Sequence, residues 1–406
     1  MGAGSLMLAA LYALTVVGFP LVSTVPTLVG VDSQVATVPF RIIVVALSVG
    51  ILYGWWVRGT RVLFNAAVLS TLTLWALLVA RMFVDTMVDP LPGDLGIPVS
   101  QFLLLSLGAC YLPALAGLEY PDARTLDLAR VWIEVLGAIA MLAILYVGLR
   151  GVFQGSVLYR LATPVLNPIS VGHLGVSVLI VTLCGFSGSG RAARLLRSLL
   201  VLLSVTVIVG SVSRGPILAA LVAALLLATR PRAGARIRLF GVVLRVALVA
   251  GAIGAIAAAI SYLEESGIID VVERLTETLQ DVASQERTAM IVGAWQQFAE
   301  NPFIGSAFVE RRFMMNPHNI ILESLMALGV VGLGLLLVSM SASLVATQRV
   351  LRIPGNHAWV GLIYVQYVIN GMLSGSLFTD GAFWLFGLGV MALAARLQRR
   401  PDELPA

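Results

Sequence analysis

The sequence Asn316-Pro317-His318-Asn319 ends a long polar stretch and stands directly before an apolar run long enough to form a membrane helix. Histidine titrates near neutral pH. At the N-terminus of a helix its protonated form is disfavoured by the helix dipole. A neutral imidazole can serve as a general base. We therefore expect His318 to take part in proton transfer at the membrane surface, and Asn319 to orient the start of the helix.

Arginines surround this pair in places where spanning a bilayer does not call for them. Arg287, Arg311 and Arg312 lie in the same polar stretch, and Arg160 and Arg214 lie in two shorter connections. Arg214 occupies a hairpin of almost no length, Ser211-Val212-Ser213-Arg214-Gly215-Pro216. An unpaired arginine at membrane depth costs about 2.5–3.5 kcal/mol on insertion scales, so it needs an anion or a structural carboxylate. Guanidinium forks bind phosphate in two-point fashion, so the set predicts a transferase that handles a phosphorylated lipid.

Two helices are predicted in the polar stretch that carries these groups. Apolar residues recur at spacings of three and four from Ile268 to Val282, which is typical of an amphipathic helix on a membrane or a bundle. Ser284 is expected to cap a second helix, with Arg287 in its first turn and Asn301-Pro302 at its end. One apolar face of this helix is expected to consist of Met290, Ile291, Ala294, Trp295 and Phe298. A cation in the first turn opposes the helix dipole, and a phosphate shared with that N-terminus would reverse this effect.

Composition sets the class of the whole chain. Of its 406 residues 59% are hydrophobic and 12% charged, and the mean hydropathy is +0.97. These values indicate an all-α polytopic membrane protein, whereas a β-barrel would show short alternating segments. All 26 basic residues are arginine. Cys110 and Cys184 lie in apolar spans and indicate neither a disulfide nor a metal site.

Twelve membrane spans are predicted, and the arginines orient them. The spans are approximately 5–22, 41–57, 62–80, 99–118, 131–149, 171–188, 198–213, 215–229, 246–263, 319–346, 360–375 and 383–397. The even connections are rich in arginine, which places them and both termini in the cytoplasm. The chain thus divides into helices 1–9 (1–263), an outer, periplasmic loop (264–318), and helices 10–12 with a short tail (319–406). The first apolar stretch is expected to be a retained helix.

Several of these motifs, in this order, resemble one family. His318-Asn319, nine residues, Gly329, two residues and Gly332 are similar to the H-N-x9-G-x-x-G signature of the O-antigen ligase and O-antigen polymerase superfamily. Asn301-Pro302-Phe303-Ile304-Gly305 resembles the motif that precedes it. Further similarities are Ser213-Arg214-Gly215 to the family's S-R-G turn, Arg287 and Trp295 to its loop helix, and, more loosely, Ser374-Gly375 through Asp380 and Trp384 to its last outer hairpin. The resemblance covers roughly residues 150–385.

The resemblance implies a membrane-embedded, GT-C-like glycosyltransferase of the bacterial inner membrane that needs no cofactor and no metal. Its donor would be a glycan on a polyprenyl (undecaprenyl) diphosphate, presented on the periplasmic face, and inversion at the anomeric carbon is expected. His318 would be the base, and Arg214 and Arg287 would hold the diphosphate. Arg160, Arg311 and Arg312 would be second-rank anion contacts, and Asp380 would pair with an arginine or with the acceptor. Partners would be membrane lipids and the two glycan substrates, without nucleic acid.

Three alternatives remain at this point. A polymerase would differ from a ligase only in its acceptor, another polyprenyl-linked glycan instead of a lipid A core sugar; the signature and the modest 150–170 loop favour the ligase. A glycolipid or sugar transporter would show half repeats and a long central cytoplasmic connection, but residues 189–197 are short. An intramembrane serine protease is suggested only by Gly185-Phe186-Ser187-Gly188, which is better explained as a helix end.

Overall fold

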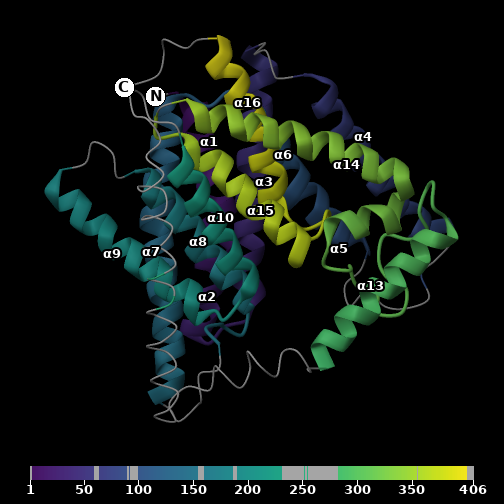
Figure 1. Cartoon of the computed structure of the whole chain (residues 1–406), viewed down its shortest axis with the longest axis horizontal. Coiled ribbons are helices and arrows are strands. Elements are labelled where there is room, and N and C mark those ends of the chain that lie inside the picture. Colours follow the sequence, from purple (N-terminus) through teal and green to yellow (C-terminus); the bar gives the residue numbers. More distant parts are fainter. Residues whose placement is uncertain are drawn as a thin grey trace.

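The chain folds into a bundle of helices (Figure 1). The computed structural model describes residues 2–58, 64–88, 91, 99–153, 160–185, 190–230, 251, 254, 282–353 and 355–399. Within these ranges the secondary structure is helical, apart from an isolated pairing of Glu310 with Met315. The all-α class expected from composition is confirmed.

The helices follow the expected spans closely. Their bounds are α1 Ala3–Ala13, η1 Leu14–Gly18, α2 Phe19–Val29, α3 Ser33–Arg58, α4 Ala66–Phe83, η2 Val84–Val88, α5 Val99–Leu104, η3 Leu105–Tyr111, α6 Leu112–Ala116, α7 Ala123–Phe153, α8 Pro168–Cys184, α9 Arg191–Gly210, α10 Arg214–Thr229, α13 Val282–Glu300, α14 Ile320–Arg352, α15 Ala358–Leu373 and α16 Gly381–Arg399. In the described part, seven helices are long and apolar enough to cross a membrane, and four shorter apolar helices accompany them. The expected span 246–263 and the first loop helix up to 281 fall outside the described residues, as does the Gly185–Gly188 motif beyond Gly185.

Two helices form the centre of the bundle. α8 is buried along nearly its whole length and packs against α7, α9, α10 and α15. α16 is equally buried and packs against α14, α15 and α6. Close approach depends on small residues: a Cβ on Gly175 of α8 would lie 3.0 Å from the Ser204 carbonyl oxygen of α9. A rigid core of this kind can fix the ends of the helices that it contains.

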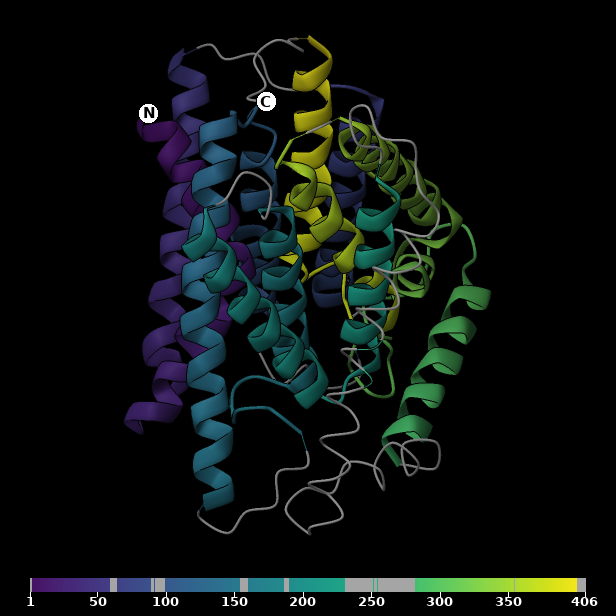
Figure 2. The same cartoon turned by 60° about the vertical axis from the view of Figure 1, so that its left-hand side comes forward.

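The helix α13 stands beside the bundle and not in it (Figure 2). It begins at Val282, so Ser284 lies inside the helix and the expected cap is wrong; Arg287 consequently lies in the second turn. Its end at Asn301-Pro302 is as expected. Only part of the expected apolar face packs: Met290 and Ala294 are buried, and Ala294 contacts Leu322 and Met326 of α14. Ile291 and Trp295 are exposed.

The two ends of the bundle differ in their charged groups. At one end Arg58 forms an ion pair with Glu119, and Arg230 donates hydrogen bonds to the carbonyls of Leu351 and Ile353. The other end is formed by residues 211–214, 318–319 and 372–380, and we call it the site end. It brings together the starts of α10, α14 and α16 and the end of α15.

Candidate active site

His318 lies directly before α14 in a strained backbone conformation. Its φ is +55°, in the left-handed region that few non-glycine residues adopt. The next residue, Asn319, caps α14: its Oδ1 accepts from the backbone N–H groups of Ile321 and Leu322 at 3.0 and 3.1 Å. The Asn319 amide also donates to the Met372 carbonyl at 3.0 Å. The cap and this second bond hold His318 against the end of α15.

The environment of His318 favours its neutral form. Burial lowers the pKa of the imidazole from its ordinary value, the positive charge of Arg287 lowers it further, and a hydrogen bond to the backbone of Ser374 opposes both effects. Nδ1 is buried and has no hydrogen-bond partner among the described residues. The pKa of His318 is lowered, as expected, but the causes are burial and the charge of Arg287 and not the helix dipole.

The S-R-G turn joins α9 to α10 and is held from outside by Arg160. The guanidinium of Arg160 donates to the carbonyls of Ser211 and Val212 at 3.3 and 3.2 Å and to Ser213 Oγ at 3.0 Å. Val212 has φ +47°, which is rare for a β-branched residue. Arg160 therefore braces a strained turn and lies next to Arg214 in space.

Arg214 opens α10 at the site end. Its side chain is exposed and makes no hydrogen bond or ion pair with the described residues. A Cβ on the adjacent Gly215 would lie 3.6 Å from Leu373 and 3.8 Å from His173 Nε2. The turn thus contacts the end of α15, the same segment that Asn319 and His318 contact. Arg214 was expected to pair with a bound anion or with a carboxylate of the protein. No carboxylate among the described residues pairs with it.

The remaining arginines lie along α13 and the loop after it. Arg287 is exposed and close enough for its charge to act on His318. The Arg311 side chain contacts Glu300 at 3.5 Å and the Ser306 carbonyl at 3.2 Å. Arg312 is exposed and reaches Gln296 at 3.4 Å. Arg214 and Arg287 are accordingly available to an anion, whereas Arg160 and Arg311 have partners within the protein.

The Asn301–Gly305 motif and the glycine of the H-N-x9-G-x-x-G signature are in direct contact. α14 is kinked at Gly329, whose φ of +64° and ψ of −155° belong to a region that only glycine occupies readily. The freed backbone accommodates the motif: Val330 N–H donates to the Pro302 carbonyl and Ser306 N–H to the Met326 carbonyl, both at 2.8 Å. A Cβ on Gly305 or on Gly329 would overlap the other segment's backbone. The kink at Gly329 therefore interrupts the helix between the two ends of the signature, His318 and Gly332.

Buried acids fasten the loops around the site. Glu323, fully buried in α14, accepts from Ser376 Oγ at 2.7 Å and from Leu377 N–H at 2.6 Å. Asp85 accepts from Phe308 N–H at 2.7 Å and is paired with Arg81. Glu323 and Asp85 were not predicted from the sequence. The signal available for Glu323 was a carboxylate inside an apolar span, since such residues are rare and mark functional or structural polar networks.

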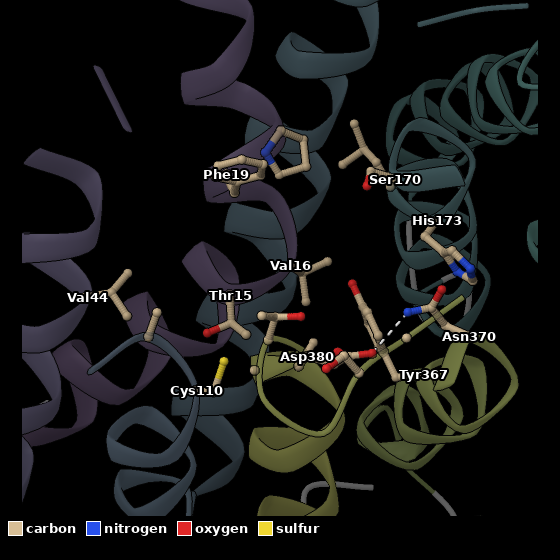
Figure 3. Close-up of a pocket in the computed structure, with 18 of the residues that line it drawn as sticks. Thr15, Val16, Phe19, Val44, Cys110, Ser170, His173, Tyr367, Asn370 and Asp380 are labelled. Atoms are coloured by element: carbon tan, nitrogen blue, oxygen red, sulfur yellow. Dashed lines mark hydrogen bonds between the residues drawn. The ribbon is translucent and has the colours of Figure 1, made fainter. Parts of the chain in front are cut away.

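Asp380 lies in a pocket of about 430 Å³ at the site end (Figure 3). Its Oδ1 accepts from Phe383 N–H at 3.1 Å and its Oδ2 from the Asn370 amide at 2.9 Å. Burial raises the pKa of Asp380 to about 6, against the effect of these two donors. The pocket has a polar wall, with Ser170, His173, Asn370 and Asp380, and a mostly apolar wall from η1, α2 and α3 that includes Phe19. Arg41 of α3 adds a positive charge to this second wall.

The turn 374–376 separates this pocket from His318. Ser374 and Gly375 line the pocket, and the Ser374 backbone is the hydrogen-bond partner of His318. The structure therefore assembles His318, Asn319, Arg214, Arg160 and Asp380 around the end of α15, with Arg287 facing His318 from α13. In the described ranges, no group of three or more His, Cys, Asp or Glu side chains is arranged to hold a metal ion.

Comparison with known proteins gives one finding. Residues 199–337 match the family model described as O-antigen ligase. This segment contains Arg214, Arg287, the Asn301–Gly305 motif and the His318 signature. No curated protein and no solved structure matches the chain. The match confirms, for residues 199–337, the resemblance to the O-antigen ligase and polymerase superfamily drawn from the motifs.

Proposed function

We propose that the protein is an O-antigen ligase. It would transfer a glycan as one unit from polyprenyl diphosphate to a sugar hydroxyl of the lipid A core. The observation that carries this proposal is that a neutral histidine lies at the end of α15, with Arg214 in the turn that contacts the same end and Arg287 facing the histidine from α13. A base and an anion site suit the two halves of a glycosyl transfer: deprotonating the acceptor and stabilising the leaving diphosphate.

The reaction balances with the groups present. The acceptor oxygen forms a bond to the anomeric carbon while the bond from that carbon to the diphosphate oxygen breaks. The hydroxyl proton goes to His318, and the electron pair of the broken bond leaves with polyprenyl diphosphate. Arg214 and Arg287 offset the charge that develops on this leaving group. Attack opposite to the leaving diphosphate inverts the anomeric configuration.

The pocket beside the 374–376 turn suits a sugar of the acceptor. Asp380 and Asn370 offer hydrogen bonds to hydroxyl groups, and the rings of Phe19 and Tyr367 offer apolar faces to a pyranose. Of the two partners expected for Asp380, no arginine bonds to it among the described residues. We therefore assign Asp380 to the acceptor.

One observation favours a ligase over a polymerase. The short connection before α8 is used to build the turn, since Leu161 N–H donates to the Gly210 carbonyl at 2.7 Å and Arg160 braces residues 211–213. In its described part, residues 160–167, Arg160 and the buried Leu161 and Leu166 are therefore not available to a second glycan chain. A polymerase needs to hold two polyprenyl-linked glycans at once.

The test is in vitro transfer by the purified protein with a polyprenyl-diphosphate glycan and EDTA, with lipid A core present or absent. A product that forms only with the core supports the ligase. Growth of the polyprenyl-linked glycan without the core would replace the ligase by the polymerase. If folded protein forms no covalent product under either condition, the transferase proposal fails. Loss of activity only when EDTA is present would contradict the expected metal independence.

A further inference from the structure

His173 is a buried histidine of α8 at the site end. It is 4% exposed, lines the pocket of Figure 3 and stacks on Tyr367 with ring centroids 6.0 Å apart. Burying a polar ring costs free energy unless its nitrogens find partners. Neither the base nor the arginines of the proposed reaction account for this side chain.

Its neighbours determine which ring nitrogen carries the proton. The Gln366 amide nitrogen donates to the His173 carbonyl at 2.9 Å, which fixes the orientation of that amide. The same nitrogen lies 3.3 Å from His173 Nδ1. It also donates to Ser177 Oγ at 2.8 Å. Because an amide nitrogen cannot accept, a proton on Nδ1 would point at a donor, so the neutral ring is expected to carry its proton on Nε2.

Nε2 points to the start of α10 and is unsatisfied. It is buried and has no hydrogen-bond partner among the described residues. A Cβ on Gly215, in the first turn of α10, would lie 3.8 Å from it. An unpaired buried donor is costly, so an acceptor that enters from elsewhere is expected at this position.

The start of α10 offers further donors at the same place. The first N–H groups of a helix have no partner within it, and the Ser213 side chain does not cap them. Its hydroxyl donates to the Ser211 carbonyl at 3.1 Å and accepts from Arg160. The Arg214 side chain adds a positive charge to this N-terminus, which favours an anion.

We propose that His173 is a substrate-binding residue whose Nε2–H donates to an oxygen of the lipid-linked diphosphate held at the start of α10. The proposal rests on the proposed function for the identity of the anion. It joins His173 to Arg214 and to the backbone N–H groups of Arg214 and Gly215 in one site. Gln366 sets the tautomer and so makes His173 a donor without a positive charge.

The test measures binding of labelled polyprenyl diphosphate, the leaving product, to the purified full-length protein, so that no glycan transfer is needed. His173→Phe keeps the ring and removes the donor, and its affinity is expected to fall at least about 10-fold, as for loss of a hydrogen bond to a charged group. His173→Gln can place an amide N–H at the Nε2 position and should stay within about 3-fold of the wild type. His357→Phe, at the start of α15, is the matched control and should bind normally.

A second variant keeps the proposal testable if His173→Phe unfolds. Gly215→Ala meets only ordinary contacts of 3.6 and 3.8 Å, so it should fold, but its methyl group stands beside Nε2 and should weaken binding of polyprenyl diphosphate. Normal binding by both His173→Phe and Gly215→Ala overturns the proposal. A parallel measurement uses phosphorylated lipid A core as the probe. If the two variants bind this probe more weakly but bind polyprenyl diphosphate normally, the proposal is also overturned. If the wild type transfers no glycan but the expected binding losses occur, His173 keeps its role and the proposed reaction fails.

Discussion

At the scale of single residues, backbone strain gathers where the chemistry is proposed. Among the described residues, the non-glycine positions with positive φ are Val212, Met314 and His318. The first directly precedes Ser213-Arg214-Gly215, and the other two precede α14. Strained residues persist only where the surroundings hold them and are concentrated at functional sites. Arg160 stabilises the strained backbone around Val212, and the Asn319 cap stabilises that at His318.

His318 is expected to be essential for transfer but not for folding. Removing a general base lowers the rate by about 10²–10⁴-fold. His318→Asn is the sharper variant, because asparagine tolerates positive φ better than alanine. Transfer rate and unfolding midpoint of the purified protein decide the matter, with His357→Asn as the control. Full activity in a folded His318→Asn protein would remove the base assignment.

Arg214 and Arg160 are expected to respond differently to substitution by lysine. Arg214→Lys should lower transfer severely at unchanged stability, because an ammonium group cannot fork onto a phosphate. Arg160→Lys should lower the unfolding midpoint, because one ammonium cannot reproduce its contacts to Ser211, Val212 and Ser213. Kinetics and thermal unfolding of both variants separate the two roles. Unchanged kinetics in Arg214→Lys would make that arginine structural.

Arg287 is expected to set the acid limit of the reaction. A general base works when neutral, so activity is lost as pH falls through the pKa of His318, which lies below its ordinary 6.5. Arg287 lowers that pKa, so Arg287→Gln should raise it and move the acid limb of kcat to higher pH. Measurement at saturating donor excludes the effect of weaker binding. Arg312→Gln should leave the limb in place; an unmoved limb in Arg287→Gln would show that its charge does not act on His318.

At the scale of elements, two loop motifs are locked by contacts between their backbones and side chains. The Asn301–Gly305 turn fits into the kink of α14 at Gly329. Phe308 from the same loop packs on Phe378 from the last loop, with ring centroids 5.7 Å apart. Glu323 fastens that last loop from inside α14. Both loops of the site are thus tied to the kinked helix.

Gly329 and Gly305 are expected to be intolerant of a side chain. Gly329→Ala adds backbone strain of about 1–3 kcal/mol and an overlap of similar cost, about 1–3 kcal/mol. Gly334→Ala in the same helix meets open space and should be neutral or stabilising by about 0.5–1 kcal/mol. Unfolding midpoints of Gly329→Ala, Gly305→Ala and Gly334→Ala test this. Equal stability of Gly329→Ala and Gly334→Ala would show that the kink is not needed.

At the scale of the whole molecule, orientation in the membrane is a prediction from the arginines. The site end should face the periplasm and the end with Arg230 and Arg352 the cytoplasm. Single cysteines at two exposed positions test this, since Cys110 and Cys184 are buried. Arg312→Cys should react with an impermeant maleimide on intact spheroplasts, and Arg352→Cys only after permeabilisation. The reverse pattern would invert the topology.

The sequence by itself determined the class, the described spans and the order of the motifs. Apolar runs of membrane length leave a chain little choice but to form helices, because backbone groups in lipid must be satisfied internally. Local signals were equally informative at Asn301-Pro302, which ends α13, and at Asn319, which caps α14. The Ser284 cap failed because the helix starts earlier, at Val282, and a short polar residue can also lie inside a helix.

Only the tertiary structure decided which groups share the site. It placed the S-R-G turn and His318 at the end of α15, although 104 residues separate Arg214 from His318. In the folded bundle Arg160 bonds to the turn, whereas Arg214 is available to an anion. The bundle also leaves His173 Nε2 buried without a hydrogen-bond partner among the described residues. The periodicity of a sequence predicts which face of a helix is buried. Which other helix packs against that face depends on how all the helices pack together. Pairings between distant segments therefore become visible only when the bundle is assembled.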